Sequence, residues 1–331
     1  MVPWVERPTI EVDLDKPLAK RFDSVPPEAI EAGRRLLAGV MAQVPAAARW
    51  LAYGVRIRTA NRFQAETTAL ARLVQADWRE VLLANTSYDL TLAFLGCSTV
   101  ALPTPHGPVL ARNMDWWPED LLAQASYILR FGRRDKLQLA SAGFPGAVGV
   151  VTGLSGQGFA VALNAVLSPD GSDRTGYPVL LFLRRVLEDA PDFDAALAMI
   201  SQQHLAAPAL ITLVGNTNQQ RVVIERTCRR SMLRWPHSDE PLVATNDYRA
   251  MFPPSESAGA EIYQTTCHRY TALCQFFSQH RPDRLVDDAE LLYILTDPSI
   301  VQTITAQHVL IRPRQLSIRL FTPTRLMQES T

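Results

Sequence analysis

Three side chains in the middle of the chain, a thiol, a guanidinium and a carboxylate, have the types and spacing needed for nucleophilic chemistry. Cys97 heads a short β-branched run, and a turn rich in proline and glycine over 103–108 separates it from Arg112 and Asp115. This strand–turn–strand pattern predicts a β-hairpin. A turn centred in the middle of that segment would place Cys97 opposite Met114, with Arg112 and Asp115 beside the thiol.

Each of these side chains has an expected role. The cation of Arg112 favours the thiolate, which is the nucleophilic form of cysteine, and Asp115 can orient the group that receives the proton. Strict alternation would put Arg112 and Asp115 on opposite faces of a strand. We therefore expect Asp115 just past the strand end or at a β-bulge. A lone cysteine is more often a small buried apolar residue, so the pairing with Arg112 and Asp115 is what favours catalysis.

No histidine in the sequence stands out as the base that would take the thiol proton. His106 falls in the predicted turn, His268 in a predicted helix, and the others are scattered. A Cys–His dyad between distant positions stays open as an alternative. A cysteine at its own chain terminus supplies a base, because an α-amino group has an unperturbed pKa of about 7.7–8.0. This interpretation predicts cleavage of the Gly96–Cys97 bond.

The elements that must position these residues change in character at Cys97. Before it, a strand over 6–16, at a sheet edge, precedes helices over 26–43, 46–57 and 63–84. After it, strands predominate, interrupted by two pairs of helices. The predicted strands cover 126–131, 137–140, 146–152, 158–164, 209–214, 221–226, 242–246, 303–310 and 315–321, and the helices cover 178–190, 192–203, 261–277 and 286–295. This order, with hairpin connections, favours an α+β fold of stacked, mostly antiparallel sheets with helices outside.

Composition excludes several classes of protein. The 331 residues include 33 basic and 33 acidic side chains without a long like-charge block, which argues against a nucleic-acid partner. No apolar run is long enough to cross a bilayer. The first residues lack a basic and apolar leader, so we expect a cytoplasmic protein. Four cysteines are too few for a disulfide scaffold in a chain of this length.

Weaker signals lie elsewhere in the sequence. The glycine spacing of 153–158 differs from that of a nucleophile elbow, so Ser155 is only a minor alternative nucleophile. Cys267, His268 and Cys274 lack a metal-ligand spacing, and we expect no metal and no cofactor.

Apolar side chains near the hairpin and in the helical part allow two interpretations. Trp116 and Trp117 either pack or line an acyl pocket. A second apolar group either packs on the catalytic part, the favoured interpretation, or makes peripheral contact with a membrane. That group comprises Met41, Trp50, Leu51 and Tyr53.

Taken together, these motifs resemble the cysteine N-terminal-nucleophile hydrolases, and within them the acid ceramidase and N-acylethanolamine acid amidase branch. The hairpin is the most specific match, together with Thr-Asn-Asp-Tyr at 245–248. The corroborating segments are 8–15 with 20–22, 81–89 and 265–270. The resemblance implies an αββα sandwich that cuts itself before Cys97. Residues 1–96 would then remain as a non-covalently attached prosegment or small subunit, and 97–331 would form the catalytic subunit.

The resemblance also implies a reaction, namely hydrolysis of the linear amide of an N-acylated amine. The acyl group is expected to be fatty, as in an N-acylethanolamine or a ceramide. Asn246 would supply the oxyanion hole and Arg269 would lie near the site. Asn164, at the end of a predicted strand, joins Trp116 and Trp117 as an expected substrate contact.

Three alternatives stay open. Gly96 before the nucleophile is similar to acyl-CoA:6-aminopenicillanate acyltransferases, which would imply acyl transfer. A penicillin V or bile-salt acylase of the choloylglycine type is a further relative, although the long prosegment and Ser155, where that type has an asparagine, argue against it. A non-catalytic lipid-binding relative that is never cleaved is the alternative outside enzymes.

Overall fold

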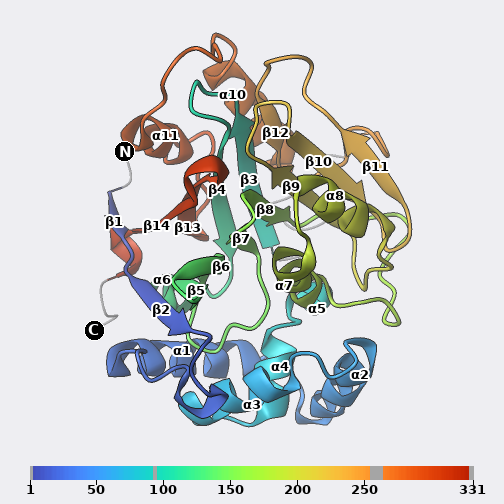
Figure 1. Cartoon of the computed structure of the whole chain (residues 1–331). Coiled ribbons are helices and arrows are strands. Elements are labelled where there is room, and N and C mark those ends of the chain that lie inside the picture. Colours follow the sequence, from blue (N-terminus) through green and yellow to red (C-terminus); the bar gives the residue numbers. More distant parts are fainter. Residues whose placement is uncertain (1–2, 92–94, 254–263, 328–331) are drawn as a thin grey trace.

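Two stacked β-sheets form the centre of the molecule (Figure 1). The computed structural model describes residues 3–91, 95–253 and 264–327. The six-stranded sheet contains, in spatial order, β1 (Trp4–Glu6), β14 (Ser317–Pro323), β13 (Thr305–Arg312), β4 (Val109–Trp116), β3 (Leu95–Leu102) and β12 (Leu242–Ala244). The eight-stranded sheet contains β11 (Ser231–Arg234), β10 (Arg221–Arg226), β9 (Ala209–Val214), β8 (Phe159–Asn164), β7 (Thr152–Ser155), β6 (Lys136–Gly143), β5 (Tyr127–Arg133) and β2 (Thr9–Asp13). Neighbouring strands run antiparallel, except that β2 is parallel to β5.

Small and branched side chains fill the space between the sheets. Ala101, Leu110 and Val309 of the six-stranded sheet meet Ala140 and Ala160 of the eight-stranded sheet in one buried cluster. Side chains on a strand alternate between its two faces, so the intervening residues point outward and pack on helices. The result is the predicted αββα sandwich.

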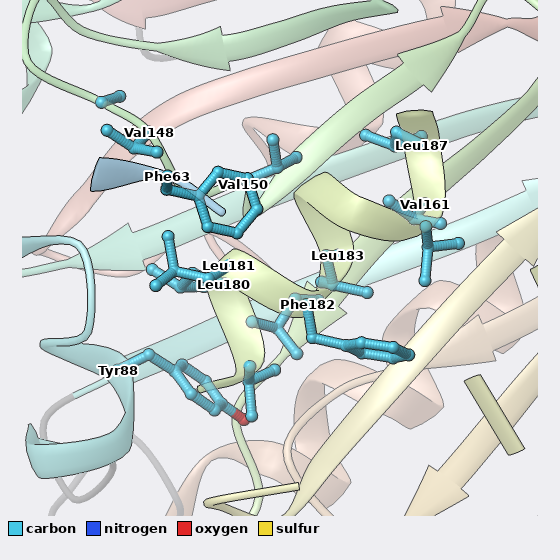
Figure 2. Close-up of a cluster of buried hydrophobic side chains, with 14 of the residues drawn as sticks. Phe63, Tyr88, Val148, Val150, Val161, Leu180, Leu181, Phe182, Leu183 and Leu187 are labelled. Carbon is cyan, nitrogen blue, oxygen red and sulfur yellow. The ribbon is translucent and has the colours of Figure 1, made fainter. Parts of the chain in front are cut away.

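Helices cover the outer faces of both sheets. α10 (Thr266–Phe276) and α11 (Asp288–Leu295) pack on the six-stranded sheet. α7 (Val179–Asp189) and α8 (Phe193–Gln202) pack on the other. Figure 2 shows Leu183 and Leu187 of α7 near Val161 of β8, and Tyr88 of the N-terminal part reaching the same cluster. None of the helices that the structure describes has the length and apolar character needed to cross a bilayer.

The N-terminal part forms a helical layer along one end of the sandwich, blue to cyan in Figure 1. Its helices are α1 (Pro27–Met41), α2 (Leu51–Arg58), α3 (Gln64–Leu73), α4 (Trp78–Ala84) and α5 (Tyr88–Thr91), and the short α6 (Glu119–Ala125) follows the hairpin of β3 and β4. α1 begins with Pro27 in its first turn, as predicted. The same part supplies two strands rather than the single one predicted, with β1 in one sheet and β2 at the edge of the other.

Two predictions about this part are wrong. The single helix expected over 63–84 is broken between α3 and α4, because Gln75 takes a left-handed conformation and Asp77 caps α4 by accepting the backbone N–H of Arg79. The favoured packing of the second apolar group is wrong for Trp50, which is 68% exposed, and for the exposed Leu51 and Tyr53, whereas Met41 packs against the core as expected.

Candidate active site

The hairpin of β3 and β4 has the predicted register, with Cys97 opposite Met114. The thiol side chain is 2% exposed and lies on the face between the two sheets. Because β3 begins at Leu95, the Gly96–Cys97 bond lies within a strand. The boundary between 1–96 and 97–331 stays a prediction.

Asp115 lies within β4 and next to a β-bulge, the second of the two positions expected for it. It pairs with Gly96 across the hairpin and with Thr305 of β13. The extra residue is in β13, between Thr305 and Gln307.

Arg112 lies directly against the nucleophile candidate. Its Nη2 donates to Cys97 Sγ, and its Nη1 donates to Thr152 Oγ1 at 2.7 Å. Burial raises the pKa of the Cys97 thiol, although the Arg112 charge acts in the opposite direction. Arg112 thus favours the thiolate as expected, while burial is the larger of the two effects on the thiol pKa.

Asp115 is fully buried, one position after Met114, the residue opposite Cys97. Its Oδ1 accepts from Thr305 Oγ1 at 2.5 Å, while its Oδ2 has no hydrogen-bond partner among the described residues. Burial raises the pKa of this carboxyl, against the attraction of the Arg269 and Arg112 charges. Burial and the two nearby cations thus act on this carboxyl in opposite directions, with burial the larger effect.

Asn246 and Arg269 hold the backbone of Cys97 from both sides. The Cys97 N–H donates to Asn246 Oδ1 at 3.1 Å, and Arg269 Nη1 donates to the Cys97 carbonyl oxygen at 2.7 Å. Arg269 Nη2 also donates to Asn246 Oδ1 at 2.8 Å. Nδ2 of Asn246 donates one hydrogen to the Ala165 carbonyl at 2.8 Å, so its second hydrogen is the donor that an oxyanion could use.

The amide of Asn164 is hydrogen-bonded within the protein, and its expected contact with substrate stays a prediction. Its Nδ2 donates to the carbonyl oxygens of Ala244 and Thr245 at 3.0 and 2.9 Å. Its Oδ1 accepts from Thr99 Oγ1 at 2.7 Å. These bonds occupy both ends of the buried amide and tie β8 to β3 and to the segment that carries Asn246.

An apolar cavity lies near Cys97, which is not itself a lining residue. The centres of water-sized molecules can occupy about 60 Å³ of it. The lining residues are Leu36, Val40, Ala84, Asn85, Ser87, Met114, Trp116, Leu122, Ala142, Gly143, Phe144, Ala147, Gly149, Val151, Leu180 and Gln307. Cys97 packs in one cluster with Leu36, Met114 and Leu122 of this wall. Trp116 lines the cavity as expected, whereas Trp117 is 45% exposed and is not part of the wall.

Both parts of the chain build this cavity. Leu36 of α1 and Ala84 of α4 face walls from the catalytic part. Asn85 fixes one of those walls, because its Oδ1 accepts from the backbone N–H groups of Val148 and Gly149 at 2.7 and 2.9 Å. Loss of the N-terminal part would therefore dismantle the cavity.

The minor candidates have other roles in the structure. Ser155 donates to the Leu187 carbonyl and accepts from the Gln157 N–H, as expected of a turn residue. Cys267 lies on α10, and its thiol contacts Asp247 and Arg249. Among the described residues, no cluster of histidine, cysteine and carboxylate side chains is placed to hold a metal ion.

Sequence reasoning missed Thr152 and Thr305, the hydroxyl partners of Arg112 and Asp115. Each lies on a strand far from the hairpin in the sequence, and a lone threonine in a strand carries no chemical signal. Only the strand register brings them to the site.

Comparison with known proteins identifies the family. The model of the acyl-coenzyme A:6-aminopenicillanic acid acyl-transferases (AAT) matches residues 103–323, more than half of the chain. The chain belongs to this family. The matched region includes Arg112, Asp115, Asn246 and Arg269, and it begins after Cys97.

The curated relatives agree with the resemblance seen in the hairpin. An N-acylethanolamine-hydrolyzing acid amidase from Caenorhabditis elegans is 25% identical over 236 residues, 65% of this chain and 66% of the relative. An acid ceramidase from Balaenoptera acutorostrata scammoni is 26% identical over 188 residues, 50% of this chain and 47% of the relative. The 40 kDa form of acyl-coenzyme A:6-aminopenicillanic-acid-acyltransferase from Emericella nidulans is 32% identical over 164 residues, 48% and 44% of the two chains. The chain thus spans about half to two thirds of the length of these relatives.

A solved structure supports the fold. The Caenorhabditis elegans N-acylethanolamine-hydrolyzing acid amidase ortholog superimposes with a TM-score of 0.55 at 21% identity, covering 66% of this chain and 93% of that one. The prediction of the αββα fold and of the family is confirmed.

Proposed function

We propose that this protein is a self-processing cysteine amidase that hydrolyses the linear amide of an N-acylated amine with a long apolar acyl group. The observation that carries the proposal is the environment of Cys97. Its thiol meets the Arg112 guanidinium, its backbone is held by Asn246 and Arg269, and an apolar cavity lies near it.

The first step in this proposal is self-cleavage. Cys97 Sγ gives up its proton and attacks the Gly96 carbonyl carbon, the bond from that carbon to the Cys97 nitrogen breaks, and the nitrogen takes up that one proton. Asp115, next to the residue opposite Cys97, is the group proposed to relay the proton, and Asn246 already accepts the N–H of that nitrogen. Water then hydrolyses the resulting thioester, which releases the Gly96 carboxylate and the free thiol.

Turnover would use the terminus so formed. The α-amino group of Cys97 takes the thiol proton as Sγ attacks the substrate carbonyl, and the tetrahedral oxyanion is stabilised by Asn246 Nδ2. The amine leaves with the proton from the α-ammonium group. Water hydrolyses the acyl thioester and restores the thiol. The acyl chain would lie in the cavity, which requires that 1–96 stay bound after cleavage.

Denaturing gel electrophoresis with N-terminal sequencing tests the processing step. Two fragments, the larger beginning at Cys97, support the enzyme. One uncut chain after incubation across acid and neutral pH supports the lipid-binding alternative. Turnover is then measured on a panel of N-acylethanolamines, ceramides, N-acyl amino acids and penicillin V.

Acyl transfer is the second candidate, favoured by the AAT family match and by Gly96 before the nucleophile. The two reactions differ in what attacks the acyl thioester. Adding 6-aminopenicillanate to a turnover assay separates them, since an acyltransferase forms the N-acyl product while a hydrolase releases free acid.

A further inference from the structure

One residue that lines the apolar cavity has a buried polar atom with no hydrogen-bond partner in the described part of the chain. Gln307 lines the cavity, its side chain is fully buried, and its Oε1 has no hydrogen-bond partner among the described residues. By contrast, the amide of Asn85, another lining residue, is bonded at both ends. Leaving a buried carbonyl without a donor costs about 1–3 kcal/mol, so this atom calls for a partner from outside the chain.

The orientation of the Gln307 amide is fixed by its neighbour. Ser126 Oγ donates its one hydrogen to the Leu122 carbonyl at 2.6 Å. It can therefore only accept from Gln307, and Nε2 lies 2.7 Å from it. A flipped amide would place two acceptors against each other. Oε1 must then point away from Ser126.

The strand register relates Gln307 to the nucleophile. Gln307 pairs with Met114, and Met114 pairs with Cys97, so the three residues form a row across β13, β4 and β3. Residues in register on neighbouring strands share a face. Two strand spacings are about 10 Å, a distance spanned by several bonds of an extended acyl chain.

We propose that Gln307 Oε1 is a specificity-determining acceptor for a hydroxyl or N–H group carried by the acyl part of the substrate, several bonds from the scissile carbonyl. The inference rests on the proposed function for the identity of the acyl group. It narrows the substrate class from plain fatty amides to amides of acyl chains with an internal hydrogen-bond donor.

The test measures binding, so that it does not depend on turnover. The full-length Cys97→Ala protein is titrated with N-ethyl decanamide and with its positional series of monohydroxylated acyl isomers. At least one isomer is expected to bind about tenfold more tightly than the plain amide. In the double variant Cys97→Ala with Gln307→Met, the ratio of the Kd of the plain amide to the Kd of that isomer is expected to fall to about one.

A matched variant distinguishes the acceptor from the cavity as a whole. Leu36→Ala, in the apolar wall, is expected to weaken all probes together and leave the ratio unchanged. The proposal is overturned if no isomer binds more tightly than the plain amide, or if the preference persists in Gln307→Met, as it would if a trapped water satisfied Oε1. A failure of the proposed function gives another result. The wild-type chain would then stay uncut and lack amidase activity, while the preference for the hydroxylated isomer in the binding assay would still be observed.

Discussion

The backbone N–H of Cys97 donates to Oδ1 of Asn246 at 3.1 Å, although 149 positions separate the two residues. The Asn246 side-chain oxygen therefore contacts the nitrogen that self-cleavage would free. The Asn246 Nδ2 has one hydrogen left to donate to a tetrahedral intermediate. The two proposed steps use different ends of the same side chain.

Asn246→Asp separates these two uses. The carboxylate keeps the oxygen that accepts from Cys97 and Arg269, but it has no donor for an oxyanion. Cleavage is expected to persist, while kcat on an amide substrate falls by at least about 10²–10³. Asn164→Ala is the contrast, because loss of its hydrogen bonds within the protein is expected to lower the melting temperature without a specific effect on kcat. An Asn246→Asp enzyme with unchanged kcat would remove Asn246 from the oxyanion hole.

Cys97→Ala is expected to abolish both self-cleavage and turnover, because the same sulfur performs both attacks. Cys274→Ala is the matched control, since this exposed thiol lies on α10 away from the cavity, and the variant should be cut like the wild type. Intact mass of the purified chains reports cleavage directly. Retained hydrolysis in Cys97→Ala would refute the assignment of the nucleophile.

Arg112 lowers the pKa of the Cys97 thiol while burial raises it. Arg112→Met removes the largest effect that opposes burial, so the thiol pKa rises further and the thiolate forms at higher pH than in the wild type. The pH profile of iodoacetamide alkylation, measured with the other cysteines replaced by serine, is expected to move to higher pH. Arg112→Lys should restore part of the shift. Coincident profiles for wild type and Arg112→Met would contradict the role given to this cation.

Much of this site could be predicted because it depends on local chain geometry. A tight turn fixes the register of a hairpin, so the Cys97–Met114 pairing follows from the sequence. Arg112 then has to lie near the thiol. The places of Asn246 and Arg269 in the site, by contrast, were predicted from the resemblance to a family. Nothing in their local sequence indicates that they contact Cys97, which is distant along the chain.

The remaining features depend on tertiary packing, which a single sequence does not reveal. The direction of the Cys97 pKa is set by how completely the two sheets and α1 exclude water. The sequence could not show that the Asn164 amide has partners within the protein, because Thr99, Ala244 and Thr245 are distant along the chain. The bulge opposite Asp115 lies on β13, which follows it by almost two hundred residues.

Asp89, near the end of the N-terminal part, predicts a pH-dependent stability. Its buried carboxyl accepts from the first N–H of α7, Val179, at 3.2 Å, and its other oxygen has no partner among the described residues. Burial raises its pKa to about 7 from the ordinary 3.8, against the charge of Arg58. Between these two pH values the folded protein holds a proton that the unfolded chain has lost, so the unfolding free energy decreases as pH rises.

Asp89→Asn removes this titration while keeping an oxygen for Val179. In the uncleaved Cys97→Ala background, the parent protein should lose stability from about pH 4 to pH 7, and the variant should lack that part of the slope. At pH 8 the variant is expected to be more stable by on the order of a few kcal/mol. Urea unfolding at several pH values measures the difference. Parallel pH dependences of the two proteins would show that Asp89 does not control the docking of this segment.

An exposed apolar face on the N-terminal helical layer gives the last prediction. Trp50 and Ile57 are 68% and 78% exposed, and the Trp50 ring stacks on Tyr53 with centroids 5.6 Å apart. Large apolar side chains gathered in this way favour a lipid interface, because their burial there removes apolar area from water. Trp50→Glu with Ile57→Glu is expected to reduce binding to phosphatidylcholine vesicles about tenfold or more, as measured by co-sedimentation. Leu285→Glu, at a similarly exposed leucine outside this layer, should leave binding unchanged. Equal binding by both variants would mean that this face does not contact lipid.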